Sequence, residues 1–207
     1  MKVLFAATLL LLFTTLVKAQ STGNSQLPVS FQKKLDDGKL IFTKPEGTIE
    51  VPVIPYTGVK YDYALKVKDK NVEVRYIIMP LTKDFFDAYE KRDKTPGDTV
   101  FNPNRMYVRL PAIMYNKIAE GKLKLEEIKL QPMHAKDQGA DGGSMFTGPV
   151  GTTFGQKYTF GFYAVIHKDY AADAYALYLF EDQTTMFDQM NELLKSSDFT
   201  GAIKFKP

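Results

Sequence analysis

Strict alternation of apolar and polar side chains is the clearest pattern in the first half of the chain. It covers residues 61–67 and resumes over residues 72–78, where every second residue is tyrosine, leucine, valine or isoleucine. A period of two is typical of a strand that buries one face. The intervening tip, Asp69-Lys70-Asn71, tolerates left-handed backbone. The pattern therefore predicts a β-hairpin over residues 61–78.

Similar patterns predict secondary structure along the rest of the chain. Further strands are predicted at residues 39–43, 48–54, 158–167, 173–180 and 202–206. Helical periodicity predicts helices at residues 82–93 and 104–120, and a third that Thr185 opens with Asp188 completing a capping box. Pro111 predicts a kink or a split in the second helix, and residues 123–130 fit either a strand or a charged helix. Hairpins without βαβ units favour an antiparallel sheet flanked by helices, an α+β fold.

The N-terminal residues have the organisation of an export signal. Lys2 precedes an uncharged, mostly apolar run over residues 3–17, and Val17-Lys18-Ala19 suits cleavage after Ala19. This run is shorter than the roughly 20 residues that span a bilayer, so we expect no integral membrane segment in the mature chain. We expect a signal peptide at residues 1–19, a linker at 20–30 and a single α+β domain at 31–207, exported to the periplasm or the extracellular space.

Charge and cysteine content exclude several classes of function. The chain has 27 basic and 24 acidic residues, a net charge of +3. Without Lys2 and Lys18, which belong to the signal, the remainder is nearly neutral, so no nucleic-acid partner is expected. There is no cysteine, which excludes disulfides, thiolate zinc sites and iron–sulfur clusters.

Residues 136–161 hold half of the 14 glycines and invite comparison with functional loops. A nucleophile elbow around Ser144 fails because Phe146 stands where the second glycine belongs. A calcium loop with Asp137 and Asp141 as ligands fails because its twelfth position is glycine. A phosphate-binding loop fails because Gln156 replaces the required lysine. We therefore expect a long, irregular connection that leads into the strands at 158–180 and offers a place for a partner to bind.

Histidine is too sparse to predict a metal centre. His134 and His167 are far apart in sequence and neither has a second histidine at helical spacing, so no metal and no cofactor is predicted. Binding is instead expected at a set of polar residues near the glycines and the last hairpin. This set is Asp137, Asp141, Ser144, His167 and Asp169.

The second half of the chain resembles a known structural group. The segment DQGADGGSMFTGP, the strands YTFGFYAVIHKD and ADAYALYLFED, an amphipathic helix and the final strand AIKFKP are similar in order to the Mog1/PsbP-like α+β proteins. This resemblance implies an antiparallel sheet flanked by helices and an accessory or binding role.

Three functional hypotheses follow. The first is an exported, non-catalytic protein that binds an unknown protein or small molecule. The second is a secreted hydrolase that draws on Asp141, Ser144, His167 and Asp169, brought together only in three dimensions. The third is a structural envelope component, with a broad exposed aromatic patch and self-association.

Overall fold

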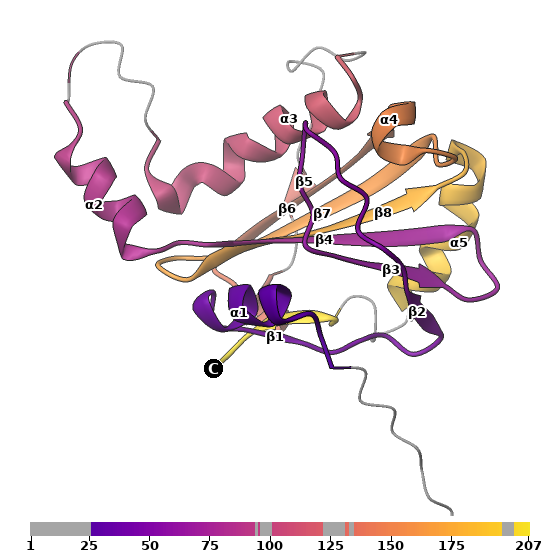
Figure 1. Ribbon diagram of the computed structural model, residues 1–207, viewed down its shortest axis with the longest axis horizontal. Helices are drawn as coiled ribbons and strands as arrows, with labels where there is room; N and C mark the ends of the chain where they lie inside the picture. Colours follow the sequence, from indigo (N-terminus) through magenta and orange to yellow (C-terminus); the bar gives the residue numbers. More distant parts are fainter. Residues whose placement is uncertain (1–25, 94, 96–100, 122–130, 133–134, 196–200) are drawn as a thin grey trace, which may run out of the picture.

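The computed structural model describes residues 26–93, 95, 101–121, 131–132, 135–195 and 201–207, and these residues form an α+β fold (Figure 1). Seven described strands form one antiparallel sheet in the order β2-β3-β4-β8-β7-β6-β5. These strands are β2 (Thr48–Glu50), β3 (Tyr63–Val67), β4 (Val72–Pro80), β5 (Gln131–Pro132), β6 (Gly142–Pro149), β7 (Phe160–Lys168) and β8 (Ala172–Phe180). A second, two-stranded sheet pairs β1 (Leu40–Phe42) with β9 (Ile203–Phe205).

Within the described residues, five α-helices and two 3-10 helices connect or cover the strands. The α-helices are α1 (Val29–Asp37), α2 (Lys83–Lys91), α3 (Met106–Ile118), α4 (Thr152–Gly155) and α5 (Gln183–Lys195), and the 3-10 helices are η1 (Pro103–Arg105) and η3 (Lys136–Gln138). Together with the antiparallel sheet, these helices confirm the predicted α+β class. None of the helices in these ranges is long and apolar enough to cross a membrane.

The sheet is buried on both faces. One face packs against α1, α5 and the small sheet, and the other packs against α3 and α4 (Figure 1). In β4, Tyr76 and Ile78 belong to the first of these cores and Ile77 to the second, as the two-residue repeat of a strand requires. The central pair β4 and β8 is in register along all of β4, from Val72 opposite Phe180 to Pro80 opposite Ala172.

Most predicted elements are present with small changes at their ends. The hairpin of β3 and β4 is confirmed, and Asp69 at its tip has a φ of 60°. Helix α3 continues through Pro111, whose side chain is buried, so the helix is not split there. The possible strand or helix at residues 123–130 lies outside the described residues.

Helix α1 was not predicted, and the start of α5 differs from the prediction. Helix α1 begins at Val29, inside the segment expected to be a linker, because Phe31 and Leu35 lie one helical turn apart and are both buried in the core. Helix α5 begins at Gln183 rather than Thr185. The side chain of Asp182 accepts a hydrogen bond from the backbone N–H of Thr185 at 2.7 Å, so Asp182 is the cap.

The prediction of a long irregular connection in the glycine-rich segment is wrong. Residues 142–149 form β6, which pairs with β7 along its whole length. Two of its glycines accommodate tyrosines of α3, since a Cβ on Gly142 would lie 2.8 Å from the Tyr107 Oη and one on Gly148 only 1.4 Å from the Tyr115 Oη. These glycines allow a helix to pack closely on the sheet.

Candidate functional site

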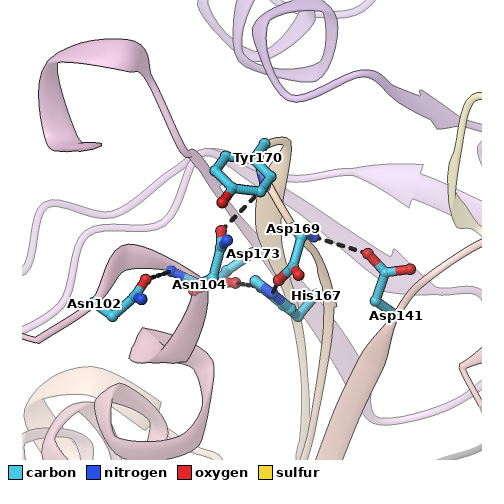
Figure 2. A network of polar contacts seen from close by, with 7 residues as sticks. All are labelled: Asn102, Asn104, Asp141, His167, Asp169, Tyr170 and Asp173. Atoms are coloured by element: carbon cyan, nitrogen blue, oxygen red, sulfur yellow. Dashed lines mark hydrogen bonds and ion pairs between the residues drawn. The ribbon is translucent and has the colours of Figure 1, made fainter. Parts of the chain in front are cut away.

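Two buried side chains, His167 and Asp173, face each other across the hairpin of β7 and β8. The two residues are direct partners in the antiparallel register, so their side chains project from the same face of the sheet. The Nδ1 atom of His167 lies 2.6 Å from the Oδ1 atom of Asp173 (Figure 2). Asp173 is fully buried, and its second oxygen, Oδ2, has no hydrogen-bond partner among the described residues.

The other imidazole nitrogen of His167 contacts a second carboxylate. Its Nε2 atom lies 2.8 Å from the Oδ1 atom of Asp169, whose side chain is 53% exposed in the turn after β7. The backbone N–H of Asp169 donates to the Oδ2 atom of Asp141 at 3.0 Å, and the N–H of Asp141 donates to the carbonyl of His167 at 2.8 Å. The structure thus brings together three of the predicted site residues (Figure 2).

Residues from α3 and α2 enclose this network. The ring of Tyr107 stacks on His167 with centroids 4.3 Å apart and planes 10° from parallel. The side-chain oxygen of Asn104, just before α3, accepts a hydrogen bond at 3.1 Å from the backbone N–H of Tyr170. The Tyr170 ring packs on Phe86 of α2 at 4.8 Å. Contacts with Asp141, Asn104 and Phe86 therefore hold the β7–β8 turn in place.

The two buried groups have coupled protonation. Burial lowers the pKa of His167, but the hydrogen bonds to Asp173 and Asp169 outweigh burial and leave the pKa raised above its usual value. Burial also raises the pKa of Asp173, and the hydrogen bond from His167 only partly opposes this. Both shifts favour the protonated form of the group concerned, and the 2.6 Å contact between Nδ1 and Oδ1 is short enough for one proton to join the two side chains.

The remaining predicted site residues do not join the network. Ser144 is buried in β6, where it lies opposite Val165. Gly142, two residues before it on the same face of the sheet, lies opposite His167. No hydrogen bond joins Ser144 to His167 among the described residues. Asp137 is exposed on η3, and no described residue bonds to its side chain.

Sequence reasoning missed Asp173, although a signal was present. Asp173 lies in a predicted strand that is otherwise strongly apolar, so nothing in the local pattern marks its carboxylate as part of a site. Pairing the two predicted strands about the turn would have placed His167 opposite Asp173, because a hairpin aligns residues at equal distances from its tip. Tyr107 and Asn104 lie about 60 residues earlier in the chain, and no local pattern connects them to the hairpin.

A second ion pair, between the buried Arg75 and the partly buried Glu73, lies on the same face of the sheet. The Arg75 Nε atom donates to Glu73 at 2.7 Å, and its guanidinium lies between the rings of Tyr61 and Phe154, 4.7 and 4.6 Å from their centroids. A further N–H of Arg75 donates to the carbonyl of Phe154. These partners surround the charge with protein groups, as expected for a structural arginine.

The network around His167 is poorly arranged for catalysis or metal binding. A general base needs an imidazole nitrogen free to face a substrate, whereas carboxylates contact both nitrogens of His167, which is 2% exposed. In the described part of the chain, no three acidic, histidine or cysteine residues are grouped to hold a metal ion. A hollow between α3 and the sheet is lined by Pro111, Met114, Tyr175 and neighbouring apolar side chains, and no residue of the network lines it.

Comparisons with known proteins identify no relative. No family model, no curated protein and no solved structure matches this chain. Its function has to be inferred from its own residues and their geometry.

Proposed function

We propose that this chain is a non-catalytic binding protein that contacts its partner through the end of the sheet at the β7–β8 turn. We call this region the turn surface and define it as Phe86, Asn104, Asp141, Asp169 and Tyr170. One observation carries the proposal. The internal contacts of His167 occupy both of its nitrogens, and the turn that they fix holds Tyr170 66% exposed.

The composition of the turn surface suits recognition. Tyrosine offers a large, rigid contact area with little loss of side-chain freedom and is enriched at protein interfaces. Here the ring is already positioned, because Phe86 supports it and Asn104 holds the backbone N–H of Tyr170. The exposed carboxylates of Asp141 and Asp169 lie beside it. A preorganised aromatic and acidic surface supports binding of a protein or a small molecule.

The hydrolase hypothesis is less well supported by the same geometry. A substrate would have to displace Asp169 before it could reach the Nε2 atom of His167. No nucleophile among the described residues contacts that nitrogen, since Ser144 is buried elsewhere on β6. The network has the acid and the histidine of a catalytic triad without the third member.

Location and fold family form part of the proposal. The apolar segment at residues 3–17 supports export to the periplasm or beyond. The antiparallel sheet with helices on both faces supports a Mog1/PsbP-like fold. A structural envelope role is less favoured, because the exposed large apolar side chains are spread over α1, β2, α2, α3 and α5.

Site-specific photo-crosslinking in the cells that make this protein tests the proposal. A photoreactive phenylalanine analogue replaces Tyr170 in one variant and Phe187 of α5 in another, because Phe187 is similarly exposed, at 60%, and is distant in the fold. We expect discrete crosslinks from position 170 that disappear when Asp141 and Asp169 are changed to Asn. Equal crosslinking from both positions would contradict the proposal. Hydrolysis of a model ester or glycoside that is lost in His167→Gln would favour the enzyme instead.

A further inference from the structure

We propose that the β7–β8 turn is a latch operated by a proton, in which deprotonation of the His167 network releases Asp169 and frees Tyr170. This latch would regulate the turn surface, so its biological purpose rests on the proposed function. The latch itself is a property of the fold and can be tested without any partner.

The two contacts of His167 together require two hydrogens. A nitrogen and a carboxylate oxygen at 2.6 or 2.8 Å attract each other only when a proton lies between them. The imidazolium form supplies both protons, one on Nδ1 and one on Nε2. A transfer of the first proton onto Asp173 leaves this count unchanged. When the network loses one proton, a lone pair faces a carboxylate and one of the two contacts must break.

The structure indicates which contact breaks. Asp173 is fully buried within β8, between β4 and β7, and without the proton from His167 its carboxylate would have no described partner at either oxygen. An uncompensated buried charge is strongly unfavourable. Asp169 is half exposed in a turn, where water can replace the imidazole as its partner. We therefore expect Nδ1 to keep its proton and Nε2 to lose it.

Release of Asp169 affects the residues beside it in the turn. Its own N–H bonds Asp141, and the next residue, Tyr170, bonds Asn104 and packs on Phe86. Tyr170 has a φ of 57°, a conformation that is costly for a non-glycine residue and persists where surrounding contacts fix it. Loss of the Asp169 contact removes one of these constraints.

The groups that face His167 set the pH range of the latch. They are Asp173 from β8, Asp169 from the turn, Asp141 before β6 and Tyr107 from α3, while Gly142 of β6 and Met79 of β4 contribute no titratable group. Lys168 is directed to the carbonyl of Gly139. Because the hydrogen bonds to the two carboxylates raise the pKa of His167, the latch is closed below the ordinary histidine value of about 6.5 and opens as the pH rises through the higher folded value.

Nuclear magnetic resonance of the imidazole tests this directly. A His134→Gln background leaves His167 as the one histidine of the chain, and long-range proton–nitrogen spectra are recorded from pH 5 to 9. We expect both nitrogens to be protonated at low pH and Nε2 to lose its proton at high pH. Exchange protection of the Asp169 and Tyr170 amides should fall by about tenfold with the same midpoint, the size expected for loss of one charge-assisted hydrogen bond. If His134→Gln disturbs folding, both histidines can be assigned in the unmodified chain.

Asp169→Asn is the matched control. The asparagine amide can accept from Nε2–H or, after flipping, donate to a bare Nε2, so its contact survives in both states. The turn amides should then show no step in protection as His167 titrates. Three results would overturn the latch: loss of the proton from Nδ1 instead of Nε2, unchanged turn protection in the Asp169-containing chain, or an identical step in Asp169→Asn. These measurements require no partner. A failed crosslinking experiment would therefore leave the latch standing, and a failed latch experiment would leave the proposed binding role standing.

Discussion

Substitution of Gly148 by alanine separates two explanations of the glycine-rich segment. If glycine is present in β6 only by default, alanine should stabilise the strand, because glycine in a strand interior costs about 0.5–1 kcal/mol relative to alanine. The structure predicts instead that alanine at this position lowers the stability of the protein. The added Cβ would lie 1.4 Å from the Tyr115 Oη and 2.4 Å from its Cζ, well inside van der Waals contact.

The surroundings of Tyr115 set the size of the effect. Its ring is almost fully buried and packs against Phe146 at 5.1 Å and Tyr163 at 5.0 Å, so it has little room to move away. Overpacking of a filled core costs typically about 1–3 kcal/mol, and a displacement this large belongs at the upper end. A cost of about 3 kcal/mol lowers the Tm by roughly 6–12 °C in a chain of this size.

Thermal and urea unfolding of Gly148→Ala, Tyr115→Leu and the double variant measure the effect. Tyr115→Leu removes the hydroxyl and shortens the side chain, so it relieves the clash with alanine at position 148. The double variant should therefore lose less unfolding free energy than the two single variants together, by about 1 kcal/mol or more. Thr147→Ala, an exposed neighbour in the same strand, should change stability by no more than about 0.5 kcal/mol. A Gly148→Ala chain as stable as the parent would refute the close-packing explanation.

Three further predictions concern polar groups. Because the folded pKa of His167 is raised, its contribution to stability is complete below about pH 6.5 and is lost as the pH rises through the folded value; thermal melts from pH 5 to 9 should show a fall in Tm that His167→Gln abolishes. Arg75→Met removes the cation from Glu73, whose side chain is only 13% exposed, and should cost about 3 kcal/mol in urea unfolding; a loss below about 1 kcal/mol would show that the pair is dispensable. Asp182→Ala should lower the Tm by removing the cap of α5, whereas Asp188→Ala, at the position that the sequence favoured, should change it little; the reverse order would restore the predicted capping box.

The parts of the fold that the sequence predicts are those where side chains report burial directly. The alternation at residues 61–78 predicts two strands, and β3 and β4 form there. The second face is covered as well, because Ala64, Arg75 and Ile77 are also buried. Strand β6 escapes prediction because Gly142, Gly143 and Gly148 have no side chain to record which face is covered. The side chains that cover Gly142 and Gly148 are Tyr107 and Tyr115, which belong to α3. The sequence of β6 alone therefore does not show which of its faces is covered.

The candidate site divides in the same way. His167 and Asp169 are two residues apart in a hairpin end, so a local pattern is enough to associate them. Asp173 requires the strand register, and Asn104 requires the packing of α3 beside the hairpin. Ser144 is predicted as a site residue because it follows Gly142 and Gly143, whereas in the structure Gly142 makes room for Tyr107. The sequence therefore locates His167 and the acidic turn but not Asp173, the buried partner of His167.

Tyr107 connects the glycine-rich strand with the protonation network. Its hydroxyl end occupies the space where a side chain on Gly142 would lie, and its ring stacks on His167, the register partner of that glycine. The absence of a side chain at position 142 thus lets α3 approach closely enough to cover the imidazole. This cover keeps water from the contact between His167 and Asp173 and leaves the Asp169 side of the network as the exposed one. A segment whose glycines invite comparison with functional loops therefore serves in the structure as a packing surface for α3. The packing buries the contact of His167 with Asp173 and leaves its contact with Asp169 partly exposed.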